Sequence, residues 1–256
     1  MRKSPGIPRV SSWFLKASRV TSANKLSWKP RRHRPLRRGS FDHSFLSMKV
    51  AILGAGNVGG ALATALARKG HSIVLGVRDP AASKYQEMAK GLGQAEASGI
   101  REAAAAAEAI VLATPWSATQ SVIEQAAGAL QGKILLDATN PIGPGFKLAL
   151  GHSTSGGEMV AAWAKGAHVY KVFNITGYNI MEDPLVDGRR AMMLVAGDND
   201  EHKGRVLQLV RDVGFEAFDF GKLENARLLE PLALVWIRLA HQQGLGRDFA
   251  FGILRR

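Results

Sequence analysis

The fold is decided by one stretch, Met48-Lys49-Val50-Ala51-Ile52-Leu53-Gly54-Ala55-Gly56-Asn57-Val58-Gly59, in which an apolar run ends in a glycine-rich turn. A continuous apolar run of this kind is typical of a strand that is covered on both faces. The G-x-G-x-x-G pattern directly follows this strand and opens a predicted helix, and this context favours a dinucleotide-binding turn. A tight turn without a ligand is the alternative.

Each glycine of the turn has an expected task. Gly54 permits the tight turn, Gly56 lets a pyrophosphate approach the backbone, and Gly59 allows close packing of helix on strand. The helix N-terminus presents unpaired N–H groups to the phosphates. The candidate phosphate-binding residues are therefore Gly54, Ala55, Gly56, Asn57, Val58 and Gly59.

Downstream of the turn, apolar runs alternate with helical patterns. The expected strands are 50–53, 72–77, 109–113, 134–137, 168–173, 191–196 and 216–220, and the expected helices lie near 58–69, 81–91, 101–107, 117–130, 157–165, 200–212 and 223–243. This alternation predicts an α/β fold, a Rossmann-type doubly wound parallel sheet with a smaller C-terminal α/β portion that ends in a long helix. Because the alternation breaks near residue 178, we expect a domain boundary there, with a dinucleotide-binding domain over 48–177 and a smaller C-terminal portion over 178–256.

The end of the second strand indicates which dinucleotide binds. An NAD site usually places an acid about 20 residues after the last glycine, where it bonds the ribose. Here Val77 is followed by both Arg78 and Asp79. We favour Arg78 as a partner for a 2′-phosphate, and therefore NADP, because Pro80 is expected to begin the next helix with Asp79 as its N-cap.

Two further loops follow predicted strands at the edge where open α/β sheets bind ligands. One carries Thr114, Pro115 and Trp116, and the other carries Asn140 and Pro141. We expect both loops to lie along the nicotinamide half of the cofactor, with the Asn140 amide offered to the carboxamide or the ribose. An ordinary Asn-Pro turn is the alternative for Asn140.

Charge is concentrated in the first part of the chain. Of the formal net charge of +13, residues 1–47 hold 12 Lys and Arg against the single acid Asp42, and 48–256 is nearly balanced. The body therefore gives no electrostatic reason to expect nucleic-acid binding. We expect residues 1–47 to be a disordered basic extension. A biological start at Met48, a targeting leader and a basic arm for nucleic acid or anionic lipid all remain open.

Several kinds of site are not expected. The chain has no cysteine, which excludes thiolate metal sites and cysteine nucleophiles and is consistent with a cytoplasmic protein. The seven histidines have no close metal spacing, so no metal is expected. No apolar run is long enough for a membrane span. The segment Gly151-His152-Ser153 lacks the glycine that completes a nucleophile elbow, and Ser155 with Glu158 instead predicts a helix capping box.

The chain resembles the NADP oxidoreductases related to the coenzyme F420-dependent NADP reductase, and is similar to the cytosolic reductase domain of six-transmembrane metalloreductases. The segments that carry the resemblance are 49–60, 76–78, 113–116, Lys171-Val172-Phe173-Asn174 and 226–233. It implies that Asn174 contacts the cofactor and that an acceptor ring stacks over the nicotinamide against a wall of Phe173, Ile175, Thr176 and Gly177. The resemblance also implies an acceptor-site and dimerisation role for the portion over 178–256. We expect no counterpart of the membrane half of the metalloreductases.

The resemblance implies direct hydride transfer between NADPH and a flavin or deazaflavin-type small-molecule acceptor such as FMN, FAD or coenzyme F420. No catalytic protein nucleophile is needed, since the protein supplies orientation and electrostatics. Two alternatives remain. The Lys222 and Asn225 pair would suit a reductase or dehydrogenase of a small hydroxy acid or imine, and the chain could be a non-catalytic NADPH-binding regulator. We further expect a homodimer in which the apolar face of the last helix, with Trp236, closes the acceptor site.

Overall fold

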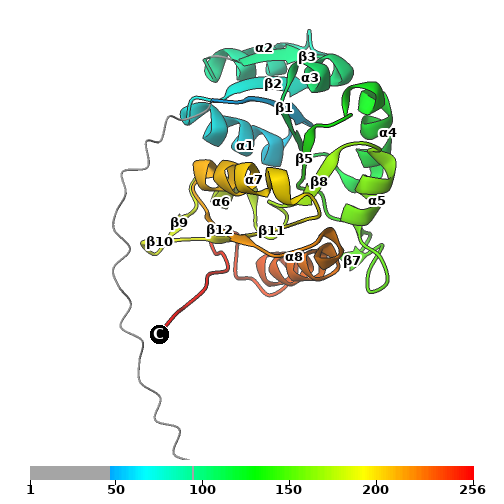
Figure 1. Cartoon of the computed structure of the whole chain (residues 1–256). Coiled ribbons are helices and arrows are strands. Elements are labelled where there is room, and N and C mark those ends of the chain that lie inside the picture. Colours follow the sequence, from blue (N-terminus) through cyan, green and yellow to red (C-terminus); the bar gives the residue numbers. More distant parts are fainter. Residues whose placement is uncertain (1–46, 94) are drawn as a thin grey trace, which may run out of the picture. The chain divides into compact units, whose positions relative to one another are not determined.

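A mostly parallel sheet with strands in Rossmann order forms the centre of the described part of the chain (Figure 1). The computed structural model describes residues 47–93 and 95–256; the prediction for residues 1–47 falls almost wholly outside them. The eight-stranded sheet has the order β12-β11-β8-β5-β4-β1-β2-β3. Its strands are β1 Lys49–Leu53, β2 Ser72–Gly76, β3 Ala95–Ser98, β4 Ala109–Leu112, β5 Ile134–Asp137, β8 His168–Lys171, β11 Met192–Gly197 and β12 Glu216–Asp219.

The direction of the strands changes once. Six neighbouring strands of the sheet are parallel to one another: β3, β2, β1, β4, β5 and β8. Beyond them, β11 runs antiparallel to β8, and β12 is parallel to β11. The register joins β11 to β8 only through Ala196–Lys171 and Gly197–Tyr170. The first half of β11 therefore extends past the carboxyl end of β8, on the edge where the sheet is expected to bind ligands. One sheet thus crosses the boundary expected near residue 178.

Helices cover both faces of the sheet. They are α1 Asn57–Arg68, α2 Ser83–Gly91, α3 Ile100–Ala106, α4 Trp116–Ala126, α5 Gly156–Trp163, α6 Tyr178–Glu182, α7 Asp200–Val213 and α8 Ala226–His241. Short 3-10 turns lie at Ala127–Ala129 and Leu223–Asn225, and two small hairpins pair β6 Ile142–Gly143 with β7 Lys147–Leu148 and β9 Leu185–Val186 with β10 Arg189–Arg190. Helix α1 packs against α6 and α7, while α3, α4 and α5 follow one another on the other face (Figure 1).

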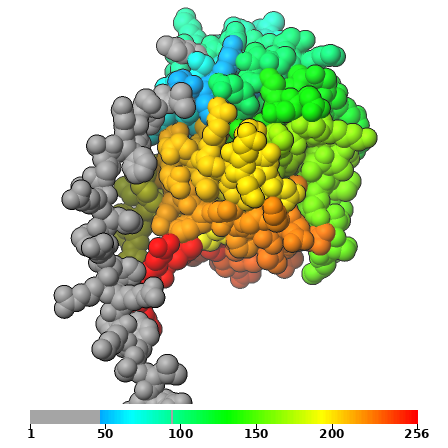
Figure 2. Space-filling view, in the orientation of Figure 1, coloured from blue at the N-terminus to red at the C-terminus, as the bar shows by residue number. Residues whose placement is uncertain are grey.

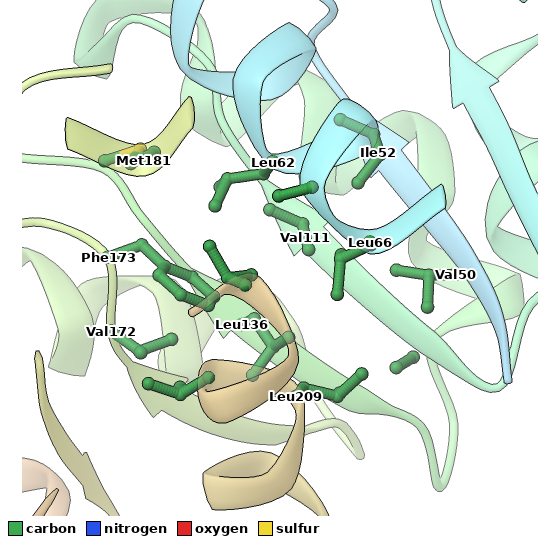
Figure 3. Close-up of a cluster of buried hydrophobic side chains, with 14 of the residues drawn as sticks. Val50, Ile52, Leu62, Leu66, Val111, Leu136, Val172, Phe173, Met181 and Leu209 are labelled. Atoms are coloured by element: carbon green, nitrogen blue, oxygen red, sulfur yellow. The ribbon is translucent and has the colours of Figure 1, made fainter. Parts of the chain in front are cut away.

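The apolar side chains form one core on each face of the sheet. The larger core joins β1 and α1 to α6 and α7, with Leu62, Leu136 and Leu209 among its fully buried members (Figure 3). The smaller core lies under α3, α4 and α5. This two-faced burial explains the continuous apolar strands of the sequence. The predicted fold class is confirmed.

The C-terminal segment completes the molecule beside β11. After α8 the chain returns along the sheet, and the Met192 amide donates to the Phe251 carbonyl at 2.9 Å. The segment appears in orange and red on the same face as the yellow residues near 200 (Figure 2). Within the described residues, no helix is long and apolar enough to cross a membrane.

Candidate functional site

A groove of about 700 Å³ lies at the carboxyl end of β1, bounded by the glycine-rich turn. It opens between the end of β2 on one side and the start of α4 on the other. Of the residues expected from the sequence, those that line it are Gly54, Ala55, Gly56, Val77, Arg78, Thr114 and Pro115. Asn57, Val58 and Gly59 form the first turn of α1, directly behind the groove wall.

The three glycines of the turn have different steric surroundings. Gly54 has a φ of +102°, and a Cβ there would lie 2.6 Å from the Ala113 carbonyl oxygen. A Cβ on Gly59 would overlap the Gly54 carbonyl oxygen, so helix and turn pack as closely as backbone allows. Gly56 differs, because no atom of the described residues lies within 4 Å of its Cβ position. The absence of a side chain at Gly56 is therefore not required by the fold and keeps open the space that faces the groove.

Helix α1 makes this space attractive to an anion. Its N-cap is Gly56 with no side-chain cap, and its first turn carries no acid. The unpaired N–H groups and the helix dipole therefore keep their partial positive charge. A diphosphate fits here, since it needs both backbone approach and N–H donors.

Two cations line the end of the groove near β2. Arg78 is exposed and forms no ion pair with any residue that the structure describes. Lys84, at the start of α2, lines the same groove and places its ammonium 4.6 Å from the Tyr85 ring centre. An anionic group on the ligand, such as a 2′-phosphate, would meet both. Lys84 was not among the site residues predicted from the sequence, because only the geometry of the turn before α2 brings it to the groove.

The turn after Arg78 differs from the prediction. The N-cap of α2 is Ala82 and the helix begins at Ser83, so Asp79 is not a helix cap. Instead its carboxylate accepts the Ala81 amide at 3.2 Å and closes a local turn. Asp79 also lines the groove, but its carboxylate is engaged by this hydrogen bond.

The expected nicotinamide side forms a second, more buried group. Asn140 donates from Nδ2 to the Asn174 carbonyl at 2.8 Å, and Asn174 Nδ2 donates to Asn140 Oδ1 at 3.1 Å. Asn174 Nδ2 also reaches the Leu229 carbonyl, at 3.2 Å. Pro141 and Trp116 both lie beside Gly156, within 3.2 Å of its Cβ position. The structure therefore brings together Trp116, Asn140, Pro141 and Asn174, whose sequence positions are far apart.

The predicted acceptor wall is only partly exposed to a ligand. The Phe173 ring lies in the core beside Val172 and Met181, with 1% of the residue exposed, so the ring is not available for stacking (Figure 3). Ile175 is buried in the same way. The backbone of Phe173 lies in the left-handed region, with a φ of +60°. Thr176 and Gly177 are half-buried, and the backbone of Gly177 packs against the Trp236 ring.

The alternative pair Lys222 and Asn225 lies outside the groove. Lys222 contacts the Asp198 carbonyl at 3.4 Å, and the Asn225 amide donates to the Phe220 carbonyl at 2.6 Å. These contacts make both residues part of the turn before α8. Within the described part of the chain, no group of three acidic or histidine side chains is placed to hold a metal ion.

Comparison with known proteins agrees with this geometry. A family model described as NADP oxidoreductase coenzyme F420-dependent matches residues 49–141. The F420-dependent NADP reductase of Methanocaldococcus jannaschii is 31% identical over 207 residues, which are 75% of this chain and 92% of that protein. The chain belongs to the F420-dependent NADP reductase family. It is thus a member of a family of oxidoreductases, as predicted.

Three further comparisons show how far the similarity of this F420-dependent NADP reductase family member extends. The metalloreductase STEAP3 of Rattus norvegicus is 34% identical over 188 residues, but the chain spans only 36% of its length. A solved structure from Arthrobacter sp. FB24 is 31% identical, with a TM-score of 0.75 over 82% of this chain and all of that one. The imine reductase of Myxococcus stipitatus in complex with NADP+ has 16% identity and a TM-score of 0.59 over 77% of this chain and 63% of its own, and shares the fold alone.

Proposed function

We propose that this protein binds NADP(H) in the groove and transfers a hydride between NADPH and a flavin or deazaflavin-type acceptor. One observation carries the proposal: the open space at Gly56 and the Arg78 guanidinium, which has no ion-pair partner among the described residues, lie in the same groove. A phosphate-rich dinucleotide with a 2′-phosphate matches both features.

The residues of the chain would divide the cofactor between them. The α1 N-terminus would hold the diphosphate, and Arg78 with Lys84 would hold the 2′-phosphate. Thr114 and Pro115 would line the passage towards the nicotinamide, and Asn140 and Asn174 would lie beside it. NADPH supplies the hydride when it is bound, so the chain needs no nucleophile and contributes orientation and exclusion of water.

The names of the relatives support the proposed acceptor class. The relatives from Methanocaldococcus jannaschii and Methanothermobacter marburgensis are named as F420-dependent, and a deazaflavin is one member of the proposed class. The alternative of a hydroxy acid or imine substrate would need a proton donor near the nicotinamide. The positions of Lys222 and Asn225 do not favour that role.

The test is to mix the purified protein with NADPH and with FMN, FAD or coenzyme F420 in turn, and to follow the loss of NADPH absorbance. We expect consumption of NADPH with at least one of the three. Consumption with an imine or a keto acid alone would favour the alternative reductase. Tight NADPH binding without turnover by any acceptor would favour a regulator.

A further inference from the structure

A fully buried lysine joins the elements that lie around the expected nicotinamide side. Lys171 ends β8, and its ammonium nitrogen lies 2.8 Å from Asp137 Oδ2 and 2.9 Å from Glu230 Oε1. It also donates to the Thr139 carbonyl at 2.8 Å. The side chains of Lys171 and Asp137 are 0% exposed and that of Glu230 is 1% exposed. These three residues are called the Lys171 network below.

Each carboxylate of the Lys171 network holds a further piece of backbone. Asp137 Oδ1 accepts the amide and the hydroxyl of Thr139 at 2.9 and 2.7 Å. Gly156 and Gly157 are the first residues of α5, and their backbone amides donate hydrogen bonds to the Glu230 carboxylate at 2.8 and 2.9 Å. One ammonium therefore connects the loop after β5, the end of β8, the start of α5 and helix α8.

The charges of the Lys171 network explain why it is stable inside the protein. Burial alone would lower the pKa of the Lys171 ammonium, but the carboxylates of Asp137 and Glu230 outweigh burial and the pKa lies above its usual value. Two carboxylates face one ammonium, and the positive end of α5 supplies the remaining compensation. Every polar group is paired, as buried charges require.

The Lys171 network ends next to the paired asparagines. Thr139, which Lys171 holds, directly precedes Asn140, and Leu229, whose carbonyl accepts from Asn174, directly precedes Glu230. Asn174 Oδ1 is buried and has no hydrogen-bond partner among the described residues. A buried acceptor without a partner suits an N–H donor, which is the group that a nicotinamide carboxamide carries.

We infer that Lys171 is a positioning residue for the nicotinamide half of the site, a role that depends on the proposed function. By fixing the Thr139 carbonyl and the two carboxylates, it would set the loop with Asn140 against the segment with Asn174. The adenine half is built by other residues, namely Arg78, Lys84 and the glycine-rich turn. Loss of the Lys171 ammonium should therefore weaken binding of the nicotinamide half and leave the adenine half unaffected.

The experiment compares two ligands by calorimetry: NADP+, which fills both halves, and 2′,5′-ADP, which lacks the nicotinamide. In Lys171→Met we expect NADP+ to bind about tenfold more weakly, the effect of one lost hydrogen bond, and 2′,5′-ADP to bind as before. Lys203→Met is the matched control. Lys203 is also a buried lysine, paired with Asp219 at 3.1 Å, but it lies on α7 and does not line the groove.

The control should lose stability without any change in the ratio of the two dissociation constants. An unchanged ratio in Lys171→Met, or equal weakening of both ligands, would overturn the positioning role. If circular dichroism shows that Lys171→Met does not fold, Asp137→Asn decides in its place, with a smaller change of the ratio in the same direction expected and no change counting against the role. Failure of the unaltered protein to bind 2′,5′-ADP would refute the NADP site and the positioning role together.

Discussion

At the scale of single residues, Arg78 is the one on which we expect cofactor choice to depend. It lies at the end of β2 on the groove, exposed and without an ion-pair partner among the described residues. In Arg78→Ala, NADPH binding should weaken by about 1.5–3 kcal/mol, the range for hydrogen bonds to a charged group, while NADH binding stays the same. Fluorescence titration with both cofactors measures this. The control is Arg189→Ala, which removes an exposed arginine of β10 outside the groove and should leave both affinities unchanged. Equal affinities of the unaltered protein for NADPH and NADH would contradict the prediction and assign the ribose to Asp79.

Substitutions at Gly56 and Gly59 should have opposite effects on cofactor binding and thermal stability, although both glycines belong to one motif. Gly56→Val places a side chain in open space, so thermal unfolding should be unchanged while NADPH binding falls by at least about 1.4 kcal/mol, or tenfold. Gly59→Ala creates an overlap with the Gly54 carbonyl, so it should lower the melting temperature. Normal NADPH affinity in a folded Gly56→Val variant would place the cofactor elsewhere.

Individual site residues could be predicted from the sequence only where local chemistry determines them. The glycine-rich turn is such a case, since its spacing and its place after a strand are visible in the sequence. The Lys171 network was missed because its partners lie 34 and 59 positions away. A signal was nevertheless present: Lys171 interrupts the apolar run of residues 169–173, and a charge inside a buried segment requires a partner. Phe173 was assigned to the acceptor wall by resemblance, and its burial in the structure shows that its ring lies in the core.

At the scale of elements, the N-terminus of helix α5 is capped by the Ser155 side chain, and Arg227 of α8 binds the Glu158 side chain of the same capping box. The Ser155 hydroxyl accepts the Glu158 amide at 3.1 Å and donates to the Glu158 carboxylate at 2.8 Å, which confirms the predicted capping box. Arg227 of α8 binds the same carboxylate through Nε and Nη2, at 2.9 and 2.6 Å. The hydrogen bond from Arg227 is the main reason that the pKa of Glu158 lies below its ordinary value.

The lowered pKa of Glu158 predicts a pH dependence of stability. A carboxyl whose pKa is lower in the folded state stabilises the protein above its unfolded pKa of about 4.3, and this contribution is lost as the pH falls through the folded value. Glu158→Gln should therefore lower the urea midpoint at neutral pH. The difference from the unaltered protein should shrink below about pH 4. The control is Glu124→Gln, on the exposed side of α4; a difference for Glu158→Gln that does not change with pH would contradict the ion pair.

Most elements were predictable because their apolar runs are continuous. The strand β3 was not, because its sequence Ala95-Glu96-Ala97-Ser98 has neither β-branched nor large apolar residues. Among the described residues it lies at the edge of the sheet, next to β2. The reversal at β11 was not predictable either, since periodicity gives the existence of a strand and says nothing of its direction.

At the scale of the whole molecule, the surface of α8 points to a second copy of the chain. Leu228 and Val235 are 59% and 48% exposed, and Leu245 just beyond the helix is 58% exposed. Trp236 itself is not exposed for such a contact, because its ring is buried against Phe249 at 5.3 Å and its indole N–H donates to the Phe249 carbonyl. We propose that the exposed face of α8, not Trp236, forms a homodimer interface.

Val235→Glu tests this proposal, because a charge on the α8 face would be desolvated in a dimer and tolerated in a monomer. Light scattering at micromolar concentration should give a dimer for the unaltered protein and a monomer for the variant. Glu124→Gln, on α4, should remain dimeric. A monomeric unaltered protein would refute the interface.

The Lys171 network also constrains how these three positions can change during evolution. Removal of one member of a buried ion-paired group costs about 3–5 kcal/mol, because the remaining charges lose their compensation, whereas joint replacement by apolar residues of similar volume is often tolerated. Mutation one position at a time must therefore cross an unstable intermediate. Among diverging lineages, Asp137, Lys171 and Glu230 should be inherited together or lost together, although 93 positions separate the first from the last.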